Sequence, residues 1–220
     1  MSKGVLFIIS AASGTGKDTI ISRVVSSPEI KAKISVSMTT RKPRKGETEG
    51  VDYFFVNKSD FENSIQNNEM LEYAKYGSSY YGTPRRQVEE WLESGYSVFL
   101  SIEVQGASLV KENLPESRSI FIVPPSMAEL ERRLRLRGTE TDEAICARLD
   151  IARHEIRKAE NYDYIVFNDN LEEAVNDVIA ICRAEVNLAN GTDDEIKSEK
   201  AEQLKSCNMR YKLKEVELND

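Results

Sequence analysis

The chain has 220 residues, of which 40% are hydrophobic and 30% are charged, the balance of an ordinary globular protein. This length allows one sizeable hydrophobic core with a small additional lobe. The formal net charge of −7 argues against non-specific nucleic-acid binding as the main activity, because a duplex binder needs a positively charged surface.

The cysteines and the N-terminus indicate the compartment. Cys146, Cys182 and Cys207 lie far apart and lack the spacing of metal ligands, so neither a disulfide framework nor a zinc site is expected. The apolar run that starts at Val5 is too short for a signal peptide or a membrane span. We therefore expect a cytoplasmic protein with no membrane partner.

Apolar runs alternate with helical patterns along most of the chain. Residues 5–9 predict a buried strand, and residues 18–25 carry apolar side chains at helical spacing. Further strands are predicted at 96–100, 119–123 and 164–167. The helical segments that follow these strands are 107–112, 126–137 and the stretch from Leu171 onward. Four buried strands alternating with helices predict a doubly wound parallel sheet.

Three segments break this alternation. Residues 35–83 contain strand-like pieces at 52–56, 73–76 and 79–81 and one helical stretch at 58–67, which predicts an inserted small mixed β lobe. Charge-dense residues 137–157 predict a helical lid, and the polar tail 191–220 is either a solvated helix or disordered. The core domain then comprises residues 1–34 and 84–190. The predicted class is α/β, with a parallel-sheet core and helices on both faces.

Residues 10–19 lie between the first strand and its helix, where a nucleotide-binding loop belongs. Gly16 and Lys17 fit the usual P-loop pattern, and Ala11 replaces its leading glycine. Small residues let successive backbone N–H groups turn toward a phosphate, and the helix N-terminus favours negative charge. The motif indicates a nucleotide phosphate; the alternative is a flexible turn with a surface lysine.

Asp18 departs from that pattern, which places a serine or threonine hydroxyl there for Mg²⁺. Either the Asp18 carboxylate holds the metal through water, or Thr19 compensates for it. A third alternative is that the added negative charge simply lowers the affinity for nucleotide.

A dense basic cluster occupies residues 37–47, and Pro43 keeps it out of a regular helix. The guanidinium groups of Arg41 and Arg44 match the oxygens of a dianionic phosphate. The alternative is a solvated basic turn.

Short segments from this cluster onward match one family in order and in spacing. They are residues 37–44, 46–47, 50–56, 72–74, 80–83, 104–106, 124–126, 137–141 and 168–169. On these segments the chain resembles the guanylate kinases over roughly residues 4–187. The resemblance implies transfer of the γ-phosphoryl group of ATP to GMP, giving ADP and GDP, in purine metabolism. It also implies small-molecule substrates, Mg²⁺ bound with ATP, no nucleic-acid partner, and a monomer or homodimer.

The resemblance assigns roles by position. The residues implied for catalysis are Lys17, Arg44, Arg137 and Arg148. Those implied for ATP are Ala12, Ser13, Gly14, Thr15, Gly16, Lys17, Asp18, Thr19, Arg133 and Asn168. Those implied for GMP are Ser37, Arg41, Arg44, Tyr53, Glu72, Tyr81, Thr83, Ser101 and Glu103. The metal would involve Asp18 or Thr19, together with Glu103.

Within this set, Glu72 and Thr83 would read the guanine, since a carboxylate accepts from its N1–H and 2-amino groups together. Ser101 is a departure, because the family commonly has an acidic residue there. Glu103 is one methylene longer than the more usual aspartate. With Asp18, these changes indicate that charge around the metal is rearranged.

Two other functions fit parts of the pattern. One is a guanylate-kinase-like module that binds phosphorylated peptides without catalysis, and the other is a kinase for another nucleoside monophosphate. Lys17 and the complete acceptor cluster favour an active enzyme, and Glu72 favours guanine. The single histidine, His154, is expected to be a lid-helix residue with no catalytic role.

Overall fold

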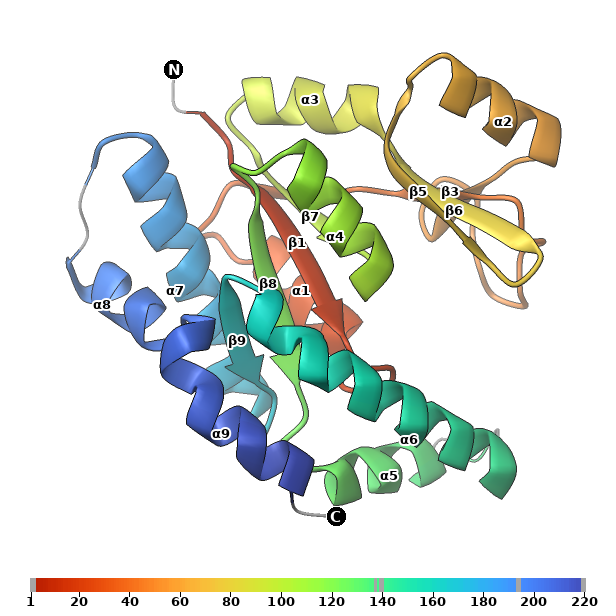
Figure 1. The fold of residues 1–220 in the computed structure, drawn as a ribbon. Helices are drawn as coiled ribbons and strands as arrows, with labels where there is room; N and C mark the ends of the chain where they lie inside the picture. Colours follow the sequence, from red (N-terminus) through yellow and green to blue (C-terminus); the bar gives the residue numbers. More distant parts are fainter. Residues whose placement is uncertain (1–2, 137, 139–140, 193–194, 219–220) are drawn as a thin grey trace.

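The computed structural model describes residues 3–136, 138, 141–192 and 195–218. Within these residues the strands form two sheets, with the smaller one projecting from the larger together with α2 (Figure 1). The larger sheet has the order β2-β7-β1-β8-β9 and its neighbouring strands are parallel. Its strands are β1 (Leu6–Ala11), β2 (Ala32–Ile34), β7 (Ser97–Ser101), β8 (Arg118–Val123) and β9 (Tyr164–Phe167).

The smaller sheet has the order β4-β3-β6-β5. Strands β3 and β4 are parallel, whereas β6 is antiparallel to both β3 and β5. Its strands are β3 (Ser37–Thr39), β4 (Tyr53–Phe55), β5 (Met70–Tyr76) and β6 (Ser79–Pro84).

Helices connect and cover these strands. They are α1 (Lys17–Val25), α2 (Lys58–Gln66), α3 (Arg85–Glu93), α4 (Val104–Asn113), α5 (Met127–Leu136), α6 (Asp142–Arg157), the 3-10 turn η1 (Lys158–Asn161), α7 (Leu171–Ala189), α8 (Glu195–Gln203) and α9 (Ser206–Leu218). In the described part of the chain, no helix combines the length and the apolar content needed to cross a bilayer.

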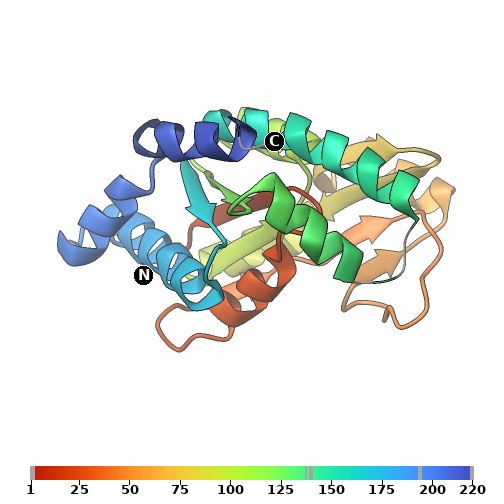
Figure 2. The same cartoon turned by 90° about the horizontal axis from the view of Figure 1, so that it is seen from below.

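The strands of the larger sheet bury side chains on both faces. Phe7 and Ile9 of β1 face one hydrophobic cluster, whereas Leu6 and Ile8 face the other. Helices α1, α7 and α8 contribute to the first cluster, and α3, α4, α5, α6 and α9 to the second. Figure 2 shows α1 and α7 on the opposite side of the sheet from α6 and α9. The predicted doubly wound α/β class is therefore confirmed.

The prediction of four core strands missed β2, and the description of the lobe missed β3. Both strands are only three residues long and contain polar residues, so neither produces an apolar run. Tertiary pairing defines them instead: β2 extends the parallel sheet along β7, and β3 lies between β4 and β6. Helix α4 also begins at Val104, three residues before the predicted start, where it packs against β5.

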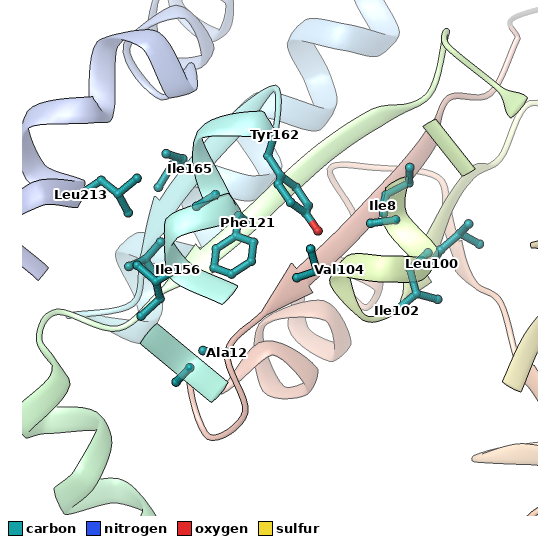
Figure 3. Packing of buried hydrophobic residues seen from close by; sticks show 14 of the residues in the cluster. Ile8, Ala12, Leu100, Ile102, Val104, Phe121, Ile156, Tyr162, Ile165 and Leu213 are labelled. Carbon is teal, nitrogen blue, oxygen red and sulfur yellow. The ribbon is translucent and has the colours of Figure 1, made fainter. Parts of the chain in front are cut away.

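The C-terminal tail differs from both alternatives predicted for it. It forms helices α8 and α9, and it buries Ala201, Leu204, Leu213 and Val216. The backbone N–H of Ile165 in β9 donates to the carbonyl of Leu204 at 2.9 Å, so the tail covers the edge of the larger sheet. Leu213 joins the cluster that contains Ile165 of β9 (Figure 3). The sparse apolar residues of the tail are therefore its packing face.

Candidate active site

The loop between β1 and α1 has the backbone that a phosphate site needs. Gly14 and Gly16 both adopt φ of 96°, a left-handed conformation that favours glycine. The Thr15 hydroxyl is buried and donates to the carbonyl of Ala12 at 2.6 Å. Because α1 begins directly after Gly16, the loop lies at the positive end of the helix dipole.

Asn168 and Arg133 support the outer side of this loop. The Asn168 amide donates to the carbonyl of Thr15 at 2.6 Å, and Arg133 Nη1 donates to the same oxygen at 3.3 Å. Arg133 Nη2 also donates to the carbonyl of Asn168 at 3.0 Å. A cavity of about 290 Å³ lies here, lined by Thr19 and Leu171 among others. The structure thus brings two predicted ATP residues to the loop from α5 and from the end of β9.

Lys17, Ser101 and Asp18 form a chain of polar contacts at the mouth of the loop. Lys17 Nζ donates to Ser101 Oγ at 2.6 Å, and Ser101 Oγ donates to Asp18 Oδ1 at 3.2 Å. Burial lowers the pKa of Lys17, and the negative charges of Asp18, Glu103 and Glu155 oppose that shift. Ser101, predicted for the acceptor, therefore lies against the phosphate loop.

Glu47 organises the basic cluster on the smaller sheet. Its carboxylate accepts two hydrogen bonds from Arg41, from Nη1 at 2.7 Å and from Nη2 at 2.9 Å. The same carboxylate accepts from the backbone N–H of Arg44 at 2.6 Å. These bonds lower the pKa of Glu47 to about 2, with the Arg41 bond as the largest cause. The geometry holds the guanidinium of Arg41 in place without any ligand.

Aromatic rings surround the Arg41 guanidinium. Its Nε donates to Tyr81 Oη at 3.2 Å, and its Cζ lies 5.1 Å from the centre of the Tyr53 ring. Strand register explains the assembly, because Ser37 pairs with Tyr53 and Thr39 pairs with Tyr81. Three short strands thus gather the predicted phosphate-binding residues from positions up to 44 apart, Ser37 to Tyr81.

Glu72 lies at the other end of the acceptor region. It pairs with Thr83 across β5 and β6, and Thr83 Oγ1 donates to Glu72 Oε1 at 2.7 Å. Glu72 is only 6% exposed, and burial raises its pKa while the bonds from Thr83 oppose that shift. The two residues predicted to read the base are therefore in direct contact.

One cavity of about 620 Å³ contains most of the predicted site. The predicted residues that line it are Ala12, Ser13, Gly14, Thr15, Gly16, Lys17, Asp18, Thr19, Ser37, Arg41, Arg44, Tyr53, Glu72, Tyr81, Ser101, Glu103 and Arg148. Thr83 is buried behind Glu72, and Arg133 and Asn168 line the smaller cavity. Arg137 lies outside the described residues.

The cavity also contains residues that the motifs did not indicate. Ile151 and Glu155 of α6 line it together with Arg148, and their spacing puts all three on one face of that helix. Burial, and then the charge of Glu103, raises the pKa of Glu155 to about 7. Glu155 Oε2 is buried with no hydrogen-bond partner among the described residues. The sequence signal that could have identified Ile151 and Glu155 is their helical spacing from Arg148.

The oxygen donors near the loop suit a hard cation. Asp18, Thr19 and Glu103 all line the larger cavity and offer carboxylate and hydroxyl oxygens. Among the described residues, no three His, Cys, Asp or Glu side chains form a cluster that would hold a metal alone. This donor set fits Mg²⁺ that keeps several waters and is bound chiefly by nucleotide phosphates.

Comparisons with known proteins agree with this geometry. The family model described as guanylate kinase matches residues 3–185. The chain is 50% identical over 183 residues to the guanylate kinase of Oceanobacillus iheyensis, covering 83% of this chain and 88% of that relative. It is 47% identical over 183 residues to the guanylate kinase of Bacillus subtilis, covering 83% and 90%.

A solved structure gives the same result. The crystal structure of guanylate kinase from Anaplasma phagocytophilum aligns with a TM-score of 0.68 at 36% identity, covering 84% of this chain and 87% of that one. The family match spans both sheets and both cavities. The chain therefore belongs to the guanylate kinase family.

Proposed function

We propose that this chain transfers the γ-phosphoryl group of ATP to GMP, giving ADP and GDP, as a step of cytoplasmic purine nucleotide metabolism. The observation that carries the proposal is that one cavity joins the Lys17 loop to the Arg41 and Glu72 cluster. Two phosphate-bearing ligands can meet end to end in that space. Family membership supports the same reaction.

ATP binds at the loop side in this proposal. Backbone N–H groups of the loop and the start of α1 surround its phosphates, and Lys17 adds a full positive charge. The cavity beside Asn168 and Arg133 takes the adenine end, since residues 14–16 of the same loop line it. This arrangement directs the γ-phosphoryl group toward the larger cavity.

The GMP phosphate binds at Arg41, Arg44, Tyr53 and Tyr81, with Ser37 beside them. These side chains offer guanidinium and hydroxyl donors, which suit a dianionic phosphate. A GMP phosphate oxygen is ionised at pH 7, so the attack on ATP needs no general base. The chain's part is therefore to position the two phosphates and to neutralise their charge.

Glu72 and Thr83 select guanine. An ionised Glu72 accepts from the guanine N1–H and 2-amino groups together, whereas adenine presents no such pair of donors. Thr83 holds one carboxylate oxygen, which fixes the plane of the carboxylate before the base arrives. A buried hydrogen-bonding site of this kind strongly rejects a base that leaves its groups unpaired.

The lid completes the site. Arg148 lines the larger cavity from α6 and contacts the transferred group on closure, and Arg137 is proposed for the same task. Closure excludes water, which would otherwise accept the phosphoryl group and hydrolyse ATP.

Asp18, Thr19 and Glu103 are the residues that would hold the Mg²⁺ that accompanies ATP, or its waters. When bound, it neutralises negative charge on the phosphates. Asp18 and Thr19 lie at the start of α1 and Glu103 follows β7, so these side chains position both segments around the ATP phosphates.

The test is ADP formation by purified protein with ATP and Mg²⁺, with GMP, AMP, CMP and UMP compared as acceptors. We expect rapid turnover with GMP and at least about a hundredfold lower kcat/KM with AMP. Folded protein that turns over no acceptor at any Mg²⁺ concentration would instead be a non-catalytic binding module. Preferential turnover of another acceptor would remove Glu72 from base reading.

A further inference from the structure

We propose that Asp18 and Ser101 act as one coupled pair of positioning residues, in which a carboxylate and a hydroxyl have exchanged places between the phosphate loop and β7. The pair holds the Lys17 ammonium group and presents one carboxylate to the cation that accompanies ATP. The inference rests on the proposed function and deepens it, because it concerns how this chain binds its donor nucleotide.

The contact between the two residues carries the proposal. Ser101 Oγ accepts a hydrogen bond from Lys17 Nζ at 2.6 Å and donates one to Asp18 Oδ1 at 3.2 Å. A hydroxyl can do both at once, since it has one donor and two lone pairs. Lys17 Nζ is also 4.0 Å from Asp18 Oδ1. The three side chains thus form one unit that joins the start of α1 to the end of β7.

Exposure shows which end of the unit faces a ligand. The side chain of Asp18 is 90% exposed, whereas that of Lys17 is 21% exposed. Asp18 also lines the larger cavity, together with Ser101 and Thr19. The carboxylate therefore stands at the open side of the loop, where the phosphates and their cation arrive.

The exchange explains two departures from the usual site, each of which alone would be expected to weaken nucleotide binding. The usual phosphate loop has a hydroxyl directly after its lysine, where this chain has Asp18. The resemblance described above places an acidic residue at the end of the strand, where this chain has Ser101. Since the two side chains touch, the pair still supplies one hydroxyl and one carboxylate beside Lys17. Their positions have changed, and the local charge has not.

The test compares four proteins: the parent, Asp18→Ser, Ser101→Asp and the double exchange D18S/S101D. Two properties are measured in each, the Kd of ADP with Mg²⁺ by calorimetry and the Tm of the ligand-free protein. Each single exchange changes the net charge by one unit, whereas the double exchange keeps it. Ser108→Asp on the exposed side of α4 is the matched control for an added carboxylate outside the cavity.

We expect each single exchange to weaken ADP binding about tenfold, because one leaves no carboxylate in the pair and the other leaves two. The double exchange should bind at least about tenfold more tightly than the two single effects predict when added. Its Tm should also lie above that of whichever single variant has the lower Tm. S108D should bind ADP like the parent.

Two results would overturn the proposal. One is additivity of the single effects in D18S/S101D, which would make the residues independent. The other is tighter ADP binding by D18S alone, which would make Asp18 a simple unfavourable charge. Should S101D fail to fold, S101A replaces it, and an equal cost of D18S in the parent and in the S101A background would then show that the two residues are independent.

These failures are distinct from failure of the proposed function. If the parent binds ADP and phosphorylates GMP while the single effects add, only the coupling is wrong. If the parent neither binds ADP with Mg²⁺ nor turns over GMP, the proposed reaction itself is wrong, and this inference falls with it.

Discussion

The two sheets of this protein present the groups proposed to bind phosphate in different ways. The larger sheet buries both faces, and Phe7, Ile9 and Phe99 are fully buried between helices. The loop after β1 offers mainly backbone N–H groups as donors, because Gly14 and Gly16 let the backbone turn them toward a phosphate. In the smaller sheet every residue of β4 is only partly buried, and the cationic groups are side chains held by Glu47 and by aromatic rings.

This contrast indicates how each half of the site is kept in place. The loop is held by the packing of a large core and by two glycines in the left-handed conformation. The acceptor half depends on a few specific contacts, among them Arg41–Glu47, Glu72–Thr83 and the ring pair Phe61–Tyr80. Substitutions in the smaller sheet should therefore affect GMP alone, whereas those in the core should affect the whole protein.

The largest expected effect tests this separation directly. Phe61 is fully buried and stacks on Tyr80 with ring centres 5.4 Å apart, so Phe61→Ala should cost about 3–5 kcal/mol of packing in the lobe. We expect the KM for GMP to rise steeply while the Kd of ADP stays within about twofold of the parent. Calorimetric unfolding measures the loss of stability, steady-state kinetics measure the KM for GMP, and titration calorimetry measures the Kd of ADP. Phe7→Ala is the matched core variant, and it should weaken both ligands; equal effects from both variants would contradict the separation.

Lys17→Met should remove catalysis while leaving both sheets folded. Lys17 is the charged group of the loop, and loss of one preorganised charge at a phosphoryl-transfer site costs roughly 10²–10³-fold in kcat. Kinetics with GMP measure the loss, and calorimetry should show unchanged GMP binding. The surface variant Lys33→Met is the control. A kcat within tenfold of the parent would place the donor phosphates elsewhere.

Arg41→Met should act on the acceptor alone. Loss of the guanidinium would remove the charge-assisted hydrogen bonds proposed for the GMP phosphate, so KM for GMP should rise about 10–100-fold with little change in KM for ATP. The neighbouring exposed residue Lys42 does not line the cavity, and Lys42→Met is the matched control. Equal changes in both KM values would show that Arg41 does not distinguish the two substrates.

Gly106→Ala tests the junction between the two sheets. A Cβ at Gly106 would lie 2.9 Å from Glu72 Oε2, while the other oxygen of this buried carboxylate, Oε1, accepts a hydrogen bond from Thr83 Oγ1. Alanine favours a helix interior by about 0.5–1 kcal/mol over glycine, which offsets part of the cost of moving Glu72, so the Tm should change by only a few degrees. KM for GMP should nevertheless rise about tenfold, because the carboxylate must move. Ser108→Ala in the same helix is the control, and an unchanged KM in G106A would show that Glu72 has room to shift.

The smallest expected effect concerns pH. The pKa of Glu155 is raised to about 7 from an ordinary value of 4.5, so the folded protein retains its proton at a pH where the unfolded chain has lost it. The contribution of protonated Glu155 to the free energy of unfolding is therefore complete below pH 4.5, and it is lost as the pH rises through 7. Glu155→Gln keeps the neutral form, so its Tm minus the parent's should be higher at pH 8 than at pH 5, by about 3 °C or more. The exposed residue Glu93 supplies the control, E93Q, and a difference that falls with pH would contradict the raised pKa.

Local patterns in the sequence were enough to predict the α/β class, the order strand–loop–helix around Lys17, and the inserted mixed lobe. These features follow from apolar runs and glycine positions, which act over about ten residues. The motif spacing shared with the guanylate kinases also indicated most residues that line the larger cavity. Short strands β2 and β3 carried no such local signal, because only pairing with β7 and with β4 and β6 defines them.

Contacts between distant residues were decided by the tertiary structure alone. Asp18 and Ser101 are 83 positions apart, and nothing in either segment shows that their side chains meet. Glu155 acquires its raised pKa only when α6 lies over the cavity beside Glu103. The sparse apolar residues of the tail become a packing face only because β9 offers them an edge and a hydrophobic cluster. The sequence thus determines which groups the site contains. Burial determines the protonation of these groups, and long-range pairing determines which partners their side chains contact.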